Sequence, residues 1–97
     1  MSIKHGSLSS IGATALQLVA PFTDAVNIKG IYVVPSNSNT GIVFIGKSTV
    51  TAGGTPATNW IPLYPTSPWL FLQINDPTEL YAIATTTGNE VFFLIQY

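Results

Sequence analysis

The chain contains no cysteine and no arginine, and charged residues of any kind are scarce. Without cysteine it has no disulfides, no thiolate chemistry and no cysteine-based metal site. Charged residues make up only 7% of the 97 residues, whereas an average soluble protein has about 25%. Its three basic residues are lysines scattered along the chain. They cannot form the basic stripe that contacts nucleic-acid phosphates or an anionic membrane surface, so neither partner is expected.

Long apolar runs are also missing. No stretch approaches the roughly 20 residues of a membrane helix, and residues 1–6 lack the apolar core of a secretory signal. We therefore expect synthesis and folding in a cytoplasm without export. Apolar residues make up 46% of the chain, which excludes disorder. A chain of this length forms one modest domain and leaves little room for a deep catalytic cleft.

Residues able to carry chemistry are few. A Ser-His-Asp arrangement would have to combine His5 with Asp24 and a serine, yet this single histidine lies in a segment expected to be mobile. Asp76 and Glu79 are close enough in sequence to pair in catalysis or, with Asn75, to bind calcium. We favour instead a turn that Asp76 caps through its own side chain. We therefore expect no enzymatic activity, no cofactor and no metal.

From residue 13 onward, short apolar runs alternate with turns rich in Gly, Pro, Asn and Thr. Such regular spacing predicts an all-β fold, an antiparallel β-sandwich or jelly-roll-like barrel of about 7–8 short strands. The expected strands cover residues 14–20, 25–34, 41–47, 60–64, 69–74, 79–86 and 90–97, with a possible short edge strand at 48–51. Gly88-Asn89 predicts a hairpin between the last two strands. Residues 1–12, rich in Ser and Gly, are predicted to be a flexible N-terminal arm on a single domain of residues 13–97.

Two of these strands carry large apolar side chains on both faces. In residues 69–74, Leu70, Leu72 and Ile74 alternate with Trp69 and Phe71. In residues 91–97 the alternation sets Val91, Phe93, Ile95 and Tyr97 against Phe92 and Leu94. Because a two-layer sandwich covers only one face of each sheet, we expect another subunit to cover the second face.

Aromatic residues cluster next to the first of these strands. Trp60, Tyr64, Trp69 and Phe71 lie within twelve residues of one another, interleaved with prolines. Three interpretations stay open: anchors of a protein interface, a corner of the core, or a platform on which sugar rings stack. The expected oligomer or partner interface consists of Trp60, Tyr64, Trp69, Phe71, Phe93 and Tyr97.

Several segments together resemble a known family. They are VNIKGIYV at 26–33, GIVFIGKSTV at 41–50, the proline-marked turn at 65–68, NDPTELYA at 75–82 and the closing aromatic strand. In this pattern, which covers most of the chain, the protein resembles the small β-sandwich virion proteins of tailed bacteriophages that decorate capsids or form the bases of head fibres. The family carries no catalytic residue to transfer.

The resemblance implies a non-enzymatic virion structural protein, a capsid decoration (cement) or head-fibre-base protein. It would bind the assembled capsid as a homo-oligomer, with a trimer favoured, and contact the major capsid protein or other virion proteins. Ile3, Lys4 and His5 are then expected to contact the capsid, because an extended arm reaches about 3.3 Å per residue. The alternative is a carbohydrate- or receptor-binding module of a phage tail or fibre, with Trp60, Tyr64 or Trp69 as the stacking platform.

Overall fold

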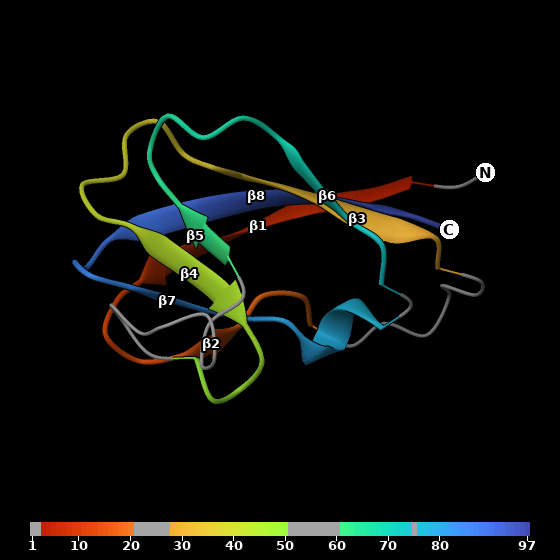
Figure 1. Ribbon diagram of the computed structural model, residues 1–97, viewed down its shortest axis with the longest axis horizontal. Coiled ribbons are helices and arrows are strands. Elements are labelled where there is room, and N and C mark those ends of the chain that lie inside the picture. The colour runs from red at the N-terminus through yellow and green to blue at the C-terminus, as the bar shows by residue number, and fades with distance from the viewer. Residues whose placement is uncertain (1–2, 21–27, 51–60, 75) are drawn as a thin grey trace.

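The computed structural model describes residues 3–20, 28–50, 61–74 and 76–97, and these form two packed antiparallel sheets of four strands each (Figure 1). The first sheet has the order β1-β8-β3-β6 and the second the order β2-β7-β4-β5. The strands are β1 (Ile3–Ile11), β2 (Leu16–Gln17), β3 (Gly30–Pro35), β4 (Val43–Gly46), β5 (Ile61–Leu63), β6 (Leu70–Leu72), β7 (Tyr81–Ala84) and β8 (Asn89–Gln96). The predicted all-β sandwich is confirmed.

The strand order is that of a jelly roll. The first strand pairs with the last, β2 with β7, β3 with β6 and β4 with β5, all antiparallel. This pattern arises when one long antiparallel ribbon of four strand pairs rolls up into two sheets. The pairs β3–β8 and β4–β7 then join neighbouring turns of the ribbon within each sheet. The sandwich therefore has jelly-roll connectivity.

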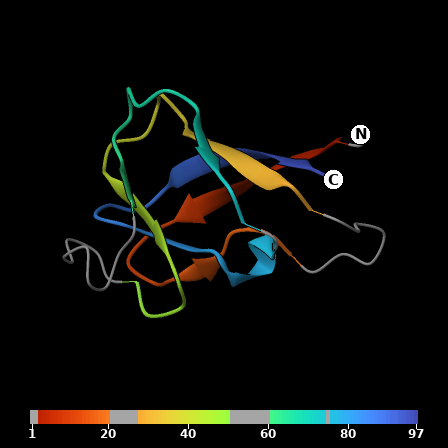
Figure 2. The ribbon, with the colours of Figure 1, turned by 45° about the vertical axis from the view of Figure 1, so that its right-hand side comes forward.

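The structure corrects the expected N-terminal arm. Residues 3–11 form β1, which runs along β8 with Ile3 opposite Gln96 and Ile11 opposite Asn89 (Figure 2). A bulge interrupts the pairing between Leu8 and Ile11. The serines and glycine of this segment suggested a loop, but the side chain of Ile11 is fully buried and ties the strand to the core.

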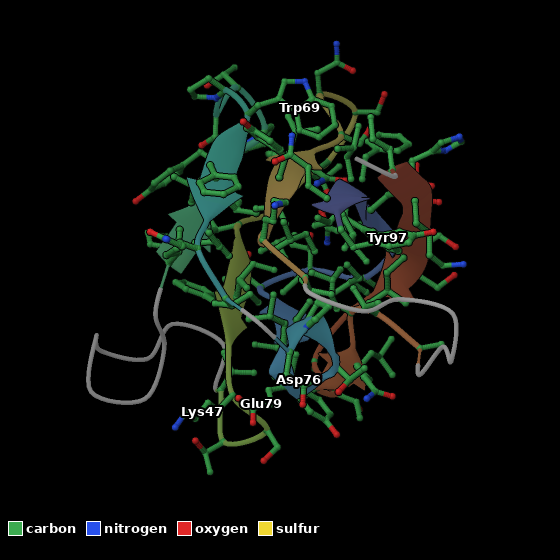
Figure 3. All side chains as sticks on the ribbon, turned by 90° about the vertical axis from the view of Figure 1, so that its right-hand side faces the viewer. Lys47, Trp69, Asp76, Glu79 and Tyr97 are labelled. Carbon is green, nitrogen blue, oxygen red and sulfur yellow. The ribbon has the colours of Figure 1, made fainter. Side chains whose placement is uncertain are left out.

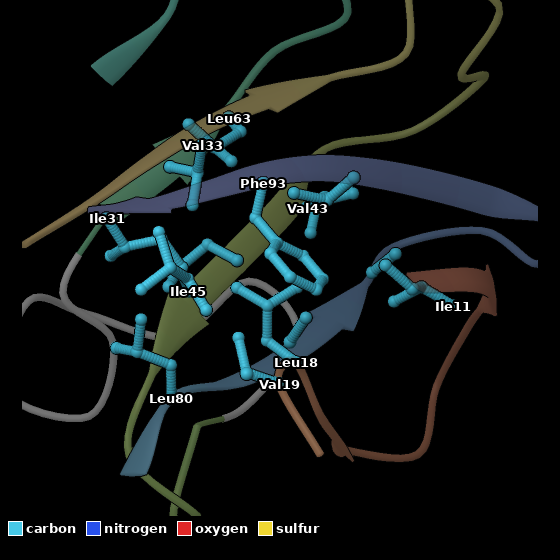
Figure 4. Packing of buried hydrophobic residues seen from close by; sticks show 14 residues of the cluster. Ile11, Leu18, Val19, Ile31, Val33, Val43, Ile45, Leu63, Leu80 and Phe93 are labelled. Atoms are coloured by element: carbon cyan, nitrogen blue, oxygen red, sulfur yellow. The ribbon is translucent and has the colours of Figure 1, made fainter. Parts of the chain in front are cut away.

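The core lies between the two sheets and follows the period-two alternation of the strands. Inward residues of β3, β4 and β8 are almost completely inaccessible. In β3 and β8 most of their neighbours along the strand are more exposed, whereas β4 is buried on both faces. The largest cluster is formed by Ile11, Leu18, Val19, Ile31, Val33, Val43, Ile45, Leu63, Leu80, Ala82, Ala84, Val91, Phe93 and Ile95 (Figure 4). This apolar layer fixes which side of each sheet is free to face outward.

The predicted hairpin at Gly88-Asn89 is also corrected, because β7 belongs to the second sheet and β8 to the first. The segment between them is a corner that carries the chain from one sheet to the other. Asn89 holds this corner: it is fully buried, donates from Nδ2 to the Thr86 carbonyl at 2.6 Å and accepts at Oδ1 from the Gly41 amide at 3.2 Å. A polar side chain at the first position of β8 thus replaces the hairpin turn.

A short 3-10 helix, η1 (Pro77–Glu79), connects β6 to β7. The Asp76 side chain caps it by accepting a hydrogen bond from the Thr78 amide at 3.2 Å, and the Thr78 hydroxyl donates to the same carboxylate. This confirms the interpretation of Asp76 as a turn cap. None of the helical structure in the described ranges has the length or hydrophobicity needed to cross a membrane.

Candidate interaction surface

The side of the first sheet that faces away from the core carries a continuous set of large side chains. The register places His5 opposite Leu94, Leu94 opposite Tyr32, and Tyr32 opposite Phe71, so these four form one row across all four strands. A second row runs from Ser7 through Phe92 to Val34, and Trp69, just before β6, has the same orientation as Phe71 by alternation. We call this surface the outer face: His5, Ser7, Tyr32, Val34, Trp69, Phe71, Phe92 and Leu94.

The outer face exposes several large apolar side chains. Trp69 is 55% exposed, Phe71 41% and Phe92 39%. Tyr32 and Val34 lie between these residues and are half-buried. Contiguous apolar surface of this kind on a soluble protein marks an interaction site more often than scattered single residues do.

Two contacts hold the ring of Phe71 in place on the sheet. Its centroid is 4.8 Å from that of Tyr32, with the ring planes tilted by 50°. Its edge lies over Gly30, where a Cβ atom would come within 2.3 Å of Cζ. Because Gly30 has no side chain, the Phe71 ring can pack down on β3. The sheet itself therefore fixes the position of this ring on the outer face.

Charge is kept away from this surface. None of the eight residues of the outer face is Asp, Glu, Lys or Arg. Lys47, Asp76 and Glu79 lie at the opposite end of the molecule from Trp69 (Figure 3). Glu90, half-buried on the same side of β8, marks the margin of the face. A partner for this face is thus selected by shape and apolar contact rather than by opposite charge.

Of the six residues predicted for an interface, two belong to the outer face: Trp69 and Phe71. Tyr64 is 52% exposed and lies outside the sheet, in a turn that its amide and the Ser67 hydroxyl close at 3.0 Å. Trp60 lies outside the described residues.

The remaining two predicted residues point inward. The expected place of Phe93 in an interface is corrected. Its side chain is only 8% exposed and its ring packs over Gly6, so it belongs to the core and cannot face a partner. Tyr97 is half-buried and packs against the same core cluster. Both share the parity of Val91 and Ile95, the fully buried residues of β8, which explains their direction.

The residues predicted to contact a capsid, Ile3, Lys4 and His5, are exposed on β1, at the edge of the first sheet. His5 belongs to the outer face, and Ile3, on the same side of the strand, is 56% exposed. They are therefore part of the sheet rather than of a separate arm, and Ile3 extends the apolar surface along β1.

The prediction omitted four residues that complete the outer face: Tyr32, Val34, Phe92 and Leu94. Their signal was present, since β3 and β8 both show large apolar residues at consecutive positions, so that both faces of each strand are apolar. What the sequence lacks is the register, which places these side chains in adjoining rows.

A shallow groove of about 420 Å³ borders the outer face next to Phe92. Its lining is uncharged: Val34, Pro35, Ser36, Asn37, Pro65, Thr66, Ser67 and Phe92. A larger open groove of about 750 Å³ lies elsewhere, beside Lys29, Asp76 and Glu79. Within the described ranges, no three His, Cys, Asp or Glu side chains gather as a metal site would require.

No family model matches this chain, and no curated protein or solved structure matches it.

Proposed function

We propose that this protein is a non-enzymatic structural component of a virion, a capsid decoration or head-fibre-base protein that binds the assembled capsid as an oligomer. The observation that supports this most is the outer face: a rigid sheet surface with exposed Trp69, Phe71 and Phe92, in a chain with only 7% charged residues. Low charge and exposed aromatics are the composition of a surface that is covered in its working state.

The architecture is compatible with this role. Jelly rolls recur in viral capsid proteins and lectins. Fold alone does not determine function. The support for assembly therefore comes from the surface. The choice of a virion follows what the sequence resemblance at residues 26–33 and 41–50 implies.

The test is the composition of the particle. Virions purified from the phage that encodes the chain should contain it in many copies by quantitative mass spectrometry, and gold-labelled antibody should decorate their heads. Particles assembled without the gene should rebind the purified protein. Particles that lack the chain, or that fail to bind it when it is added back, contradict the proposal.

A second candidate, a carbohydrate-binding module, is favoured by one observation. Trp69 and Tyr64 are more than half exposed, and an uncharged groove with hydroxyl and amide groups lies beside Phe92. A neutral sugar requires such a combination of aromatic face and neutral hydrogen-bonding groups. Glycan-array binding that Trp69→Ala abolishes would support this function over the first, and an array without binding would remove it.

A further inference from the structure

We propose that the outer face is covered by the same face of a second copy of this chain, related by a twofold axis. The inference rests on the oligomer of the proposed function and deepens it by naming both the surface and its occupant. In such an isologous contact each residue meets the equivalent residue or a neighbour of it. The first requirement is thus that two copies of the face can meet without repulsion between equivalent residues.

The charge distribution meets this requirement. A face that carries acidic or basic groups brings like charges together across a twofold axis, which costs free energy in a desolvated contact. The eight residues of the outer face include no Asp, Glu, Lys or Arg, and Glu90, the neighbour of Phe92 on the same side of β8, lies at the margin. Its apolar and aromatic surface is complementary to another copy of itself without any charge pairing.

The geometry meets the second requirement, a surface that can pack on a flat partner. Two sheets stack face to face about 10 Å apart with their strands nearly aligned, and side chains from both interdigitate. Phe71 is already placed by Gly30 and Tyr32, so its ring loses little conformational freedom on contact. Trp69 and Phe92 lie on either side of the smaller Val34, so the surface is uneven there. Side chains of a second copy can pack into the space between the two rings.

Pairing of free edges is the competing way to join two copies, and β1 is poorly suited to it. A bulge between Leu8 and Ile11 breaks its regular hydrogen-bonding edge, and Ser10 has a positive φ of 59°. Bulges and edge lysines, here Lys4, are features that discourage a further strand from adding to a sheet. At the β1 edge, the structure thus favours contact through the face over extension of the sheet.

The size of the face sets the expected strength. Four strands about 4.8 Å apart and about six residues long cover roughly 400 Å² in plan on each copy. Specific interfaces of standard size bury about 800 Å² per partner. Self-association through this face is therefore expected to be reversible and to increase with protein concentration.

The first experiment measures the mass of the full chain by sedimentation velocity from micromolar to millimolar concentrations. A monomer–dimer equilibrium is expected, whereas the resemblance to decoration proteins implies a trimer. Trp69→Ser and Phe92→Ser should each weaken the dimer by about tenfold or more, the loss typical of a buried aromatic anchor. Tyr64→Ser, an equally exposed aromatic in the turn after β5, is the matched control and should leave the dimer unchanged. Circular dichroism confirms that each variant is folded.

The second experiment uses the absence of native cysteine. Val34→Cys and Leu94→Cys each place one thiol on the outer face, and Ser48→Cys places one in the exposed segment after β4. A short bismaleimide should link two copies through position 34 or 94 and not through position 48. A dimer that resists linkage at both outer-face positions contradicts the same-face contact.

The outcomes separate this inference from the proposed function. A chain that stays monomeric at millimolar concentration, or that forms a trimer, yet is found on virions overturns the twofold contact and leaves the virion role standing. A chain that dimerises through the outer face but is absent from virions overturns the virion role alone.

Discussion

The ring of Phe71 occupies the space that a side chain at residue 30 would need. A Cβ on Gly30 would lie 2.3 Å from Cζ of Phe71 and 2.8 Å from the carbonyl oxygen of Leu72. The second atom belongs to the backbone of the paired strand β6, which cannot move without disturbing the β3–β6 ladder. A single missing side chain therefore sets both the packing of an edge strand and the shape of the outer face.

Gly30→Ala should destabilise the fold by about 1–3 kcal/mol, the usual cost of overpacking a site that cannot relax. Urea unfolding followed by circular dichroism measures the change. Adding Phe71→Ala should recover only part of the loss, because the contact with the Leu72 carbonyl persists. An unaltered unfolding midpoint for Gly30→Ala would show that the ring and β6 move freely.

Truncation of the two adjacent phenylalanines of β8 should destabilise the fold to very different extents. Phe93→Ala removes a ring that is 8% exposed and should lower the free energy of unfolding by about 3–5 kcal/mol. Phe92→Ala removes a ring that is 39% exposed and should cost less than about 1 kcal/mol. Thermal melts of dilute protein, in which self-association is negligible, give the comparison. Equal losses of folding free energy in the two variants would mean that both faces of β8 are buried to the same extent.

Asn89→Ala should destabilise the corner between β7 and β8. The change leaves the Gly41 amide and the Thr86 carbonyl without their partner, and each buried group left unpaired costs about 1–3 kcal/mol. Asn89→Asp should be at least as harmful, because a carboxylate oxygen would then face the Thr86 carbonyl. Amide hydrogen exchange at Gly41 is the most direct readout, and protection that survives Asn89→Ala would contradict this role.

Removal of residues 1–12 should prevent folding rather than merely release a binding arm. The deletion leaves β8 without its neighbour on one side and takes Ile11 out of the core. Circular dichroism and the cooperativity of the thermal transition test this. Deletion of residues 1–2 alone is the control and should leave the transition in place. A cooperative transition at the original temperature in the chain lacking 1–12 would restore the idea of a dispensable arm.

Asp76→Ala should cost about 1 kcal/mol through loss of the cap on η1, whereas Asp76→Asn should be nearly neutral because an amide oxygen also caps. Neither EDTA nor added calcium should shift the melting temperature, since a ligand that binds the native state must raise it. A rise with calcium that Asp76→Asn abolishes would instead indicate a cation site at this turn.

Alternation along single strands made much of the fold predictable. In β8 the sequence separates Val91 and Ile95 from Phe92, and the structure buries the first two and exposes the third. The same rule separates Leu70 and Leu72 from Phe71 in β6. Alternation does not say which face meets the core, so Phe93 was assigned to an interface although its ring packs inside.

Pairing between distant segments was the part that local signals could not supply. Residues 3–11 have the composition of a loop, and only their alignment with β8 and the burial of Ile11 make them a strand. Gly88-Asn89 has a hairpin signal, yet the strands it joins belong to different sheets. The outer face likewise depends on register, which brings Tyr32 next to both Leu94 and Phe71.

The pairing of β1 with β8 has a kinetic consequence. During synthesis β1 leaves the ribosome early, but its partner emerges only after the other strands of both sheets have been made. Until then β3 also lacks β8, its neighbour in the first sheet. Folding dominated by such distant contacts is slow and leaves apolar strands open to aggregation. We therefore expect the nascent chain to depend on chaperones, and its soluble yield to increase at lower temperature, where apolar contacts between incompletely folded chains are weaker.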